Sequence, residues 1–317
     1  MQFWPRVRAS RQYAQVRSYP QSNEAKPLAF AGYKAGMTHV MAIDTNKNSP
    51  TKGEQISVPA TVIECPPLKI YSVRFYTPKG YGTAVSTELF FKAEKELSKK
   101  TPLAKKVSAA EDLDKVDLTE VKDITLQVYT QPKLAGFGQK KPEVFEIGLG
   151  GSVQDKLAYV KEQIGKDIAV SDVISQGANI DLRAVTKGKG YQGPVKRFGV
   201  AIRARKSEKT KRGPGSLGAW IAQGHTMYRI AFAGQMGYHN RTQYNNLVLD
   251  IVDDASAVNP KGGFINYGEA KNTCVLIKGS VPGPKKRLVT MTAPMRVAHN
   301  VTLPTVKAIS TESNQGN

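Results

Sequence analysis

The feature that most constrains this chain is a long basic segment between residues 183 and 241. It holds 13 Lys and Arg residues and one acid, Glu208. Its most charged stretch, "RARKSEKTKRGPGSLGAW" (203–220), is too rich in Gly, Pro and Ser to form a stable helix. Like charges at this density oppose compaction unless an anion neutralises them. The segment is also too long for a plain connecting loop, so we expect it to be functional or ordered by a partner.

The remaining charge is segregated along the chain. The net charge of the 317 residues is +20, residues 1–23 and 278–296 contain basic residues and no acid, and residues 86–175 hold 15 acids against 14 Lys. A charge that served only solubility would not be divided in this way. Nucleic acid is therefore the first partner class to consider, and an anionic membrane surface is the second.

Membrane and secretory roles find little support in the sequence. No stretch approaches the roughly 18 to 20 apolar residues of a membrane span, and the N-terminus lacks the apolar run of a secretory signal. No basic amphipathic helix with exposed large apolar residues is apparent, so we expect no membrane partner. Cys65 and Cys274 lie far apart in no ligand motif, which favours a reducing compartment without a disulfide framework.

Composition divides the chain into five parts. Residues 1–27 are polar and basic and contain Pro5, Pro20 and Pro27, as expected of an extended arm. Runs rich in β-branched and aromatic residues indicate strands at 58–65, 69–77, 178–188, 245–253, 272–280 and 287–294. We predict a mainly β protein with an α/β insertion. Its parts are the N-terminal arm (1–27), a β-barrel core (28–85, 176–200 and 240–305), the insertion (86–175), a basic central extension (183–241) that overlaps barrel strands at its base, and a C-terminal tail (306–317).

Periodicity predicts two helices and a strand inside the insertion. In "TELFFKAEKELSKK" (87–100), Leu89, Ala93 and Leu97 recur at helical spacing. In "SVQDKLAYVKEQIGK" (152–166), Ser152 and Asp155 have the spacing of a capping box that opens a helix. "DITLQVYTQP" (123–132) alternates like a strand.

Enzymatic motifs are weak. "GKGYQG" (188–193) satisfies the dinucleotide-binding glycine pattern, but Pro194 follows at once and no helical run is predicted, so we interpret it as a flexible turn beside a phosphate chain. His39, His225, His239 and His299 are scattered without metal-ligand spacing. The adjacent Asp253 and Asp254 are best explained as a polar turn. We therefore predict no cofactor, no metal site, no small-molecule substrate and no catalytic residues.

Aromatic residues interleave the basic segment. They are Tyr191, Phe198, Trp220, Tyr228, Phe232 and Tyr238. We expect Phe198 and Phe232 to form a small core at the base of the segment. Trp220, at the end of a glycine-rich turn, is a better candidate for an exposed contact that stacks on a base.

Four motifs in order carry a resemblance to a known family. "PLAFAGYKAGMTHV" (27–40), "VTKGKGYQGPVKRFGV" (185–200), "GSLGAW" (215–220) and "AGQMGYHNRTQYN" (233–245) resemble the universal ribosomal protein three family of the large subunit. "FWPRVRA" and "RSYP" in the arm, together with the chain length, are similar to its archaeal branch. The resemblance spans residues 1 to about 300, and the insertion matches only in general character.

The resemblance implies a fold, a place and a set of contacts. It implies a translation-protein-type β-barrel on the solvent side of the large subunit, near the 3′ domain of the large rRNA, and a cytoplasmic protein in the ribosome. The central extension would reach inward with Trp220 at its tip near the peptidyl transferase centre. Gln235 matches a glutamine that is methylated in bacterial members, whereas the histidine modified in eukaryotic members has no counterpart in "KTKRGPGS" (209–216).

The predicted rRNA-binding residues come from the arm, the extension and one loop near the C-terminus. They are Arg6, Arg8, Arg11, Arg17, Lys187, Lys189, Lys196, Arg197, Arg203, Arg205, Lys206, Lys209, Lys211, Arg212, Trp220, His225, Arg229, Gln235, His239, Arg241, Lys285, Lys286 and Arg287.

Two functions remain to be compared. The first is a structural constituent of the large subunit that binds rRNA and neighbouring ribosomal proteins, aids early assembly and extends Trp220 toward the catalytic centre. The alternative is an RNA-modifying enzyme with a basic cleft, which would need a nucleophile, paired carboxylates or a cofactor loop near the basic segment. The sequence shows none of these there.

Overall fold

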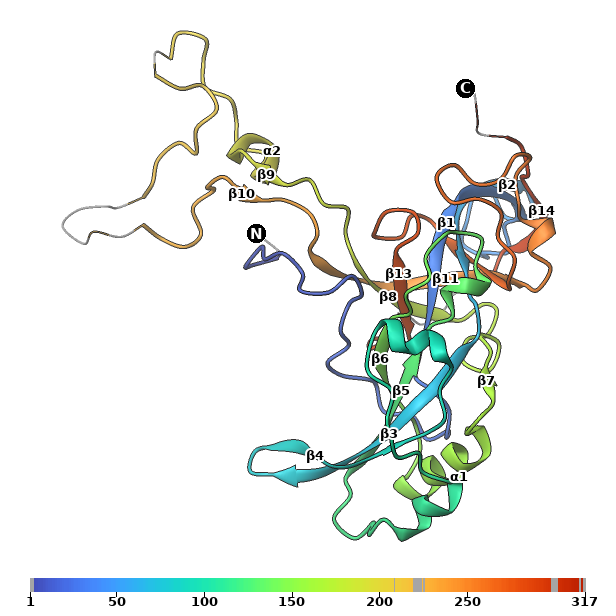
Figure 1. The fold of residues 1–317 in the computed structure, drawn as a ribbon. Helices are drawn as coiled ribbons and strands as arrows, with labels where there is room; N and C mark the ends of the chain where they lie inside the picture. The colour runs from blue at the N-terminus through green and yellow to red at the C-terminus, as the bar shows by residue number, and fades with distance from the viewer. Residues whose placement is uncertain are drawn as a thin grey trace.

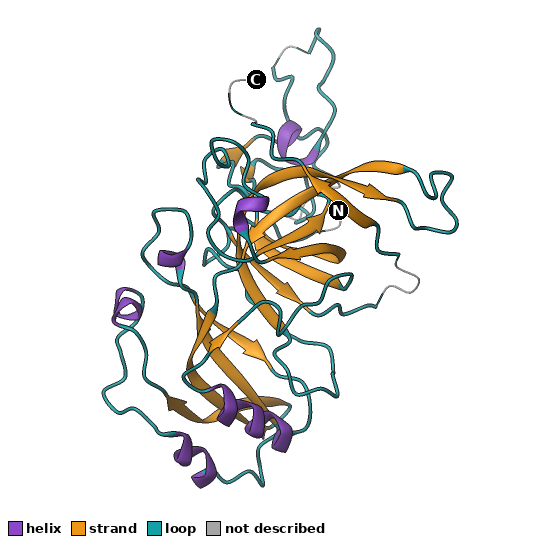
Figure 2. Ribbon diagram, turned by 90° about the vertical axis from the view of Figure 1, so that its right-hand side faces the viewer, coloured by secondary structure: helices purple, strands orange, loops and turns teal. Residues whose placement is uncertain are grey.

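The chain forms two β-sheet units from which an arm and an extension project. The computed structural model describes residues 3–207, 209–218, 224, 226–297, 302–313 and 315. Figure 1 shows the extension leaving the upper unit and the N-terminal end of the arm projecting toward the same side, and Figure 2 shows the two groups of strands one above the other. The second half of the arm runs along the lower unit, where the Tyr19 hydroxyl donates to the Glu146 carbonyl.

The first unit contains a seven-stranded antiparallel sheet in the order β13-β8-β11-β12-β2-β1-β14. Because β13 pairs with both β8 and β1, the pairing of six of these strands closes on itself. The strands are β1 (Ala29–Ile43), β2 (Gln55–Glu64), β8 (Asn179–Val185), β11 (Asn240–Val252), β12 (Cys274–Lys278), β13 (Leu288–Thr292) and β14 (Thr305–Ile309).

The strands of this unit are buried over continuous runs of residues, as in β12 and β13. Phe30, Tyr33, Ile63, Leu182 and Val289 are fully or almost fully buried inside this unit. Removing such large apolar side chains from water is the main favourable contribution to folding. The six runs predicted as strands are confirmed, since each overlaps one strand of the structure.

The second unit, which we define as residues 68–168, is built on a five-stranded sheet. Four strands follow the order β4-β3-β5-β6, and β7 pairs with β3. Its strands are β3 (Leu68–Lys79), β4 (Gly82–Phe90), β5 (Asp123–Tyr129), β6 (Val144–Gly148) and β7 (Asp167–Ile168). Its helices are η1 (Lys95–Lys99), η2 (Ala110–Lys115), η3 (Pro132–Leu134) and α1 (Val153–Gln163).

Helix α1 confirms the predicted helix start. The Ser152 hydroxyl accepts a hydrogen bond from the Asp155 backbone N–H at 3.3 Å, and the Asp155 carboxylate accepts from the Ser152 N–H at 3.2 Å. Such a reciprocal box satisfies two N–H groups that the first helical turn leaves free. Val160 is buried, so the apolar stripe of the helix faces the sheet.

The helix predicted over residues 87–100 is wrong. Residues up to Phe90 belong to β4, where Leu89 lies opposite Val73, and only Lys95–Lys99 form a short 3-10 turn. Pairing with the long strand β3 supplies backbone hydrogen bonds and burial that outweigh local helical spacing.

The second unit begins earlier in the chain than the insertion that the sequence suggested from residue 86. Both β3 and β4 belong to the second sheet, so this unit begins at Leu68, whereas the sequence suggested that the barrel core extends to residue 85. A run such as 69–77 has the same β-branched pattern in either sheet. Its partner strand is set by contacts between residues distant in the chain.

The predicted C-terminal tail begins as a strand. Residues Thr305–Ile309 form β14 and pair with the second half of β1, from Val40 opposite Ile309 to Ile43 opposite Thr305. Val306 and Ile309 pack against the core from this edge. Because β1 offers an unpaired edge there, a short apolar segment gains hydrogen bonds that its own sequence does not reveal.

A buried carboxylate joins the two units. Glu64, at the end of β2, is fully buried, and one of its oxygens accepts hydrogen bonds from the backbone N–H groups of Lys271 and Asn272 at 2.8 and 3.1 Å. The other oxygen accepts from the Tyr267 hydroxyl and from the N–H of Gly136, which follows η3 of the second unit. A buried charge is stable only when its lone pairs are satisfied in this way.

Helices are few and short. Among the described residues, none is long and apolar enough to cross a membrane.

Candidate nucleic-acid interface

The extension leaves the first unit as a continuation of β8 and β11. Its two limbs, residues 186–192 and 234–240, are joined by backbone hydrogen bonds, among them Thr186 N–H to His239 at 3.0 Å and Lys189 N–H to Met236 at 2.9 Å. Gly237, at a φ of 73°, lets the limbs approach closely, because a Cβ there would lie 2.1 Å from the Lys187 carbonyl oxygen. The base of the extension is therefore a paired ribbon rather than a loose loop.

The glycine motif ends in a short helix that the sequence interpretation missed. Strand β9 (Tyr191–Gln192) pairs with β10 (Gly234–Gln235), and α2 (Pro194–Phe198) follows directly. Pro194 occupies the first helical turn, where a missing N–H costs nothing, and Gly199 ends the helix at a φ of 70°. The expectation of no helical run after "GKGYQG" is therefore wrong, although five residues make a helix far shorter than that of a dinucleotide fold.

Arg197 clamps the two limbs without losing its charge. Its Nε donates to the Gln235 carbonyl at 3.0 Å and its Nη1 to the Phe232 carbonyl at 2.9 Å. Carbonyl oxygens accept hydrogen bonds but carry no net negative charge, so the guanidinium remains an unneutralised cation. A planar fork of donors suits this bridging role better than a lysine would.

The N-terminal arm is bound along the base of the extension. Ala9 N–H donates to the Tyr238 carbonyl at 2.8 Å, and Nδ1 of the buried His239 lies 2.8 Å from the Val7 carbonyl oxygen. Arg6 Nη1 donates to the Arg197 carbonyl. The arm is extended, as predicted, and these contacts fix its path.

Arginine and aromatic side chains from the arm and the extension interleave where they meet. Trp4 lies between Phe198 and Tyr228, with ring centroids 6.1 and 6.0 Å away. Arg6 lies 4.3 Å from the centre of the Phe198 ring, a distance typical of a cation–π contact. We name this group the arginine–aromatic cluster, and its members are Phe3, Trp4, Arg6, Arg8, Arg197, Phe198, Tyr228, Arg229, Tyr238, Arg241 and Arg287.

Tyr238 and Phe3 form further cation–π contacts in the cluster. The guanidiniums of Arg8 and Arg287 lie 5.6 and 5.1 Å from the Tyr238 ring, and that of Arg241 lies 4.5 Å from the Phe3 ring. Aromatic faces hold the flat guanidiniums in place, and they leave the N–H edges free to bind phosphate oxygens.

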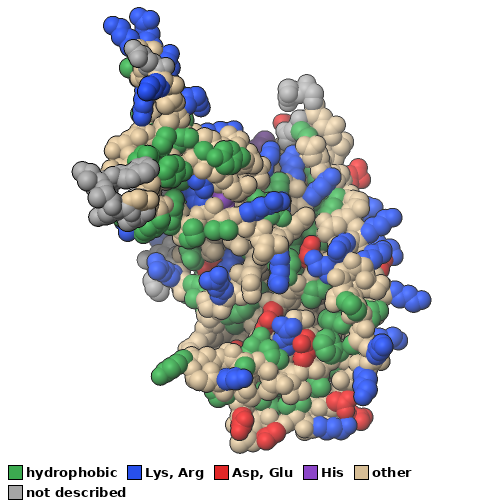
Figure 3. Space-filling view, turned by 60° about the vertical axis from the view of Figure 1, so that its left-hand side comes forward, with side chains coloured by type: hydrophobic (Ala, Val, Ile, Leu, Met, Phe, Trp, Pro, Cys, Tyr) green, Lys and Arg blue, Asp and Glu red, His purple; other side chains and the backbone are tan. Residues whose placement is uncertain are grey.

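The cluster gathers positive charge without a carboxylate partner. Among the described residues, no Lys or Arg between 183 and 241 forms an ion pair. Burial, and then the nearby charge of Arg6, lowers the pKa of Arg197 and that of Arg241. Arginine stays charged in proteins, and the contribution of Arg6 shows that like charges lie close together here, a repulsion that a bound anion would relieve. Figure 3 shows Lys and Arg side chains gathered on the projecting extension and mixed with acidic ones over the second unit.

The other predicted contact residues are mostly exposed cations. Arg203 N–H donates to the Lys211 carbonyl at 3.0 Å, which folds the most charged stretch back on itself. The exposed ones are Arg8, Arg11, Arg17, Lys187, Lys189, Lys196, Arg203, Arg205, Lys206, Lys209, Lys211, Arg212, Arg229 and Lys286. Trp220 and His225 lie outside the described residues.

Two residues predicted to bind rRNA, His239 and Gln235, form hydrogen bonds within the protein. His239 is buried and holds the arm, as described above. The Gln235 side-chain amide donates to the carbonyls of Met236 and Gly237 at 3.2 and 3.0 Å, so it supports the turn of its own limb. The expected core residue Phe232 is 43% exposed, whereas Phe198 packs against Trp4 as part of the cluster.

Sequence reasoning missed three residues that shape this surface. Phe3 and Trp4 supply aromatic faces, and the signal for them was an apolar pair in an otherwise polar arm. Lys34 is buried on β1 and donates to the carbonyls of Val281 at 2.6 Å and Gly283 at 3.2 Å. It thereby holds the loop that carries Lys285, Lys286 and Arg287, and no local pattern could have indicated this.

Comparison with known proteins assigns the family. The chain is 46% identical over 99% of its length to the large ribosomal subunit protein uL3 of Methanothermobacter thermautotrophicus, and 45% identical to that of Methanosphaera stadtmanae, with 96% of each relative covered. It is 41% identical to the same protein of Methanopyrus kandleri, of which 90% is covered. The profile of the family described as ribosomal protein L3 matches residues 1–316. The chain therefore belongs to the ribosomal protein L3 family.

Proposed function

We propose that this protein is a structural constituent of the large ribosomal subunit, in the cytoplasm, and that it binds large-subunit rRNA through the arm, the extension and the loop at Lys285–Arg287. The observation that carries this proposal is the arginine–aromatic cluster, in which guanidiniums are held by carbonyls and rings and have no carboxylate partner among the described residues. Phosphate neutralises such charges, and exposed rings stack on bases. Membership of the L3 family supports the same assignment.

Within the subunit, we propose a place for each part of the fold. The cyclic six-strand pairing is the translation-protein-type β-barrel, placed on the solvent side near the 3′ domain of the large rRNA. The extension reaches inward between RNA helices and brings Trp220 toward the peptidyl transferase centre. Neighbouring ribosomal proteins contact the remaining surface, and early binding to rRNA helps the subunit assemble.

Salt dependence of binding tests the RNA interface. The logarithm of the affinity for large-subunit rRNA should fall linearly with the logarithm of salt concentration, by about 0.9 per duplex phosphate neutralised. The protein should also sediment with the large subunit after a high-salt wash. A shallow slope, or equal affinity for unrelated RNAs at high salt, would contradict the proposal.

Substitution of Trp220 tests the role of the tip. Trp220→Ala should leave subunit assembly largely intact and impair tRNA binding or peptidyl transfer. A variant that unfolds the free protein would show that this tryptophan is a core residue, and the proposed role would then be wrong.

The enzymatic alternative loses its support. The family and the relatives are ribosomal proteins and not enzymes.

A further inference from the structure

A fully exposed aromatic side chain, Tyr81, lies on the second unit at the tip of the hairpin formed by β3 and β4. Lys79 pairs with Gly82, so Gly80 and Tyr81 alone form the turn, and Gly80 takes a positive φ of 58°. Tyr81 is fully exposed, with an accessible fraction of 114%. The hairpin projects from the body of the unit in Figure 1.

Tyr81 differs from the other tyrosines of this sheet. Tyr71 and Tyr129 are buried, and the Tyr76 hydroxyl donates to Glu146 at 2.6 Å. Tyr81 gains no burial from the fold, and an aromatic residue has no conformational advantage in a two-residue turn, where Asn and Gly are favoured. Its flat ring is therefore available to a partner on both faces.

The surroundings of the tip favour RNA as that partner. Between residues 75 and 87 the hairpin carries Lys79 and no acid, whereas the paired charges Arg74 and Glu88 lie at its base, 3.2 Å apart. Nothing lies within 4 Å of where a Cβ would stand on Gly80 or Gly82, so a nucleotide can approach from either side. A ring beside a single cation matches a base and its phosphate, and base stacking tolerates any sequence.

The hairpin also points toward the proposed RNA surface. In Figure 1 the hairpin, the arm and the extension all project to the same side of the molecule. An RNA bound to the arginine–aromatic cluster would therefore lie on the side of the molecule from which the hairpin emerges. The second unit, which is otherwise balanced in charge, thus presents one site suited to RNA.

We propose that Tyr81 stacks on an unpaired nucleobase of large-subunit rRNA while Lys79 neutralises an adjacent phosphate. This contact rests on the proposed function and adds a second, separate RNA site to it. The site adds an RNA contact on the second unit to those of the arm and the extension, so that the RNA meets the protein at both units.

Chemical probing of rRNA at nucleotide resolution tests this contact. The full-length protein, bound to purified large-subunit rRNA, is compared with Tyr81→Ala, Tyr81→Leu, Tyr81→Phe and Lys79→Gln. Ala and Leu should expose a small, discrete set of unpaired nucleotides and lower the affinity by about 5- to 100-fold, as expected for loss of one stacked base. Phe should retain the protection because it retains the ring, and Lys79→Gln should weaken binding and reduce the salt slope.

Controls separate the possible outcomes. Val85→Ala alters another exposed apolar residue of the same hairpin and should leave the rRNA protections unchanged. All variants should melt like the parent because Lys79, Tyr81 and Val85 are exposed. Unchanged protections in Tyr81→Ala, or full protection by Tyr81→Leu, would overturn the stacking proposal and would indicate a protein partner or none. If the unsubstituted protein protects no rRNA at all, the proposed function itself fails, which is a distinct result.

Discussion

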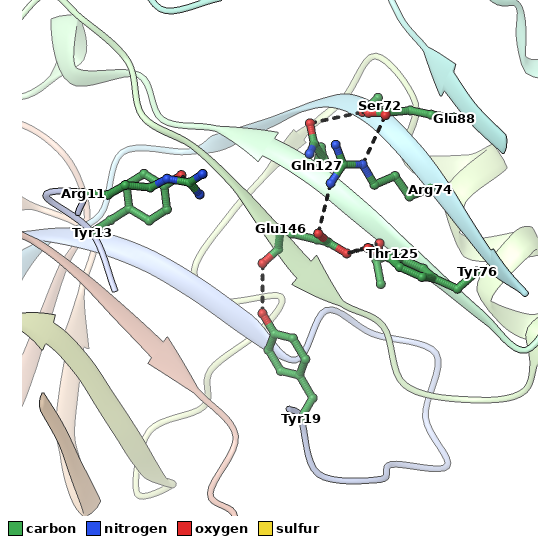
Figure 4. A network of polar contacts seen from close by, with 10 residues as sticks. All are labelled: Arg11, Tyr13, Tyr19, Ser72, Arg74, Tyr76, Glu88, Thr125, Gln127 and Glu146. Carbon is green, nitrogen blue, oxygen red and sulfur yellow. Dashed lines mark hydrogen bonds and ion pairs between the residues drawn. The ribbon is translucent and has the colours of Figure 1, made fainter. Parts of the chain in front are cut away.

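Arginine side chains have different partners at the base of the extension and in the second unit. In the second unit, Arg74 lies 3.2 Å from Glu88 and 3.3 Å from Glu146, and Glu146 also accepts hydrogen bonds from the hydroxyls of Tyr76 and Thr125. Figure 4 shows this network, with the Tyr19 hydroxyl of the arm reaching the Glu146 carbonyl. At the extension, Arg197 contacts carbonyls and an aromatic ring, and no carboxylate of the described part of the chain pairs with it.

The difference teaches what a cation does in each place. A guanidinium paired with carboxylates contributes to the stability of the fold, and its charge is neutralised within the protein. A guanidinium held by carbonyls and aromatic faces is positioned equally well but keeps its charge for an external anion. The partners of an arginine, more than its exposure, indicate whether it serves the fold or the ligand.

The largest expected effect comes from removing the distal charge of the extension. Changing Arg203, Arg205, Lys206, Lys209, Lys211 and Arg212 to Gln should lower rRNA affinity more than about 1,000-fold at physiological salt and reduce the salt slope by up to about 0.9 per cation removed. Filter binding over a salt series measures both quantities. Thermal stability should not change, since these side chains are exposed.

A matched set in the second unit provides the control for this variant. Lys92, Lys95, Lys99, Lys105, Lys106 and Lys140 are also exposed, and changing these six to Gln removes the same total charge. The affinity and the slope should fall far less. Equal losses from the two sets would mean that net charge alone, and not its placement, drives binding.

The next largest effect concerns the buried joint between the two units. Glu64→Ala leaves the Tyr267 hydroxyl and the N–H groups of Lys271 and Asn272 without an acceptor, so the free energy of unfolding should fall by about 3 kcal/mol. Denaturant titration measures the loss, and Glu64→Gln, which keeps an acceptor oxygen, should lose less. A loss below about 1 kcal/mol in Glu64→Ala would show that the carboxylate is dispensable.

A smaller loss is expected within the paired network. Glu146→Ala removes one partner of Arg74 and the acceptor of Tyr76 and Thr125, and should lower the free energy of unfolding by about 2 kcal/mol. Affinity for rRNA, measured by filter binding under conditions where the variant is folded, should stay within about twofold of the parent. A marked loss of affinity would break the distinction between the two regions.

The smallest expected effect is on rRNA affinity and comes from changing Arg197 alone. Arg197→Lys keeps the charge but loses the fork that joins the carbonyls of Phe232 and Gln235, so affinity should fall about tenfold while the salt slope stays the same. Its exposed neighbour Lys196, changed to Gln, should instead lower the slope by about 0.7 to 0.9. If Arg197→Lys binds like the parent, the clamp does not position the limbs.

Several features could be predicted from the sequence because they depend on local properties. The β-branched runs indicated six strands of the two sheets, and Ser152 with Asp155 indicated the start of α1. The segregation of charge located the extension and its exposed cations, since composition is visible without coordinates. Four motifs in order then indicated the family that the comparisons assign.

The tertiary structure decided which distant residues meet. Residues 87–90 joined β3 as a strand despite their helical spacing, and Thr305–Ile309 found the free edge of β1. The arm came to lie against the extension, where Trp4 meets Phe198 and Val7 meets His239. Local propensity and charge are properties of neighbouring residues in the chain. Contacts between distant residues decide which strands pair, and they also decide whether a cation meets a carboxylate or a carbonyl. For this reason the sequence alone determined where the cations are, and only the fold decided which of them remain unneutralised.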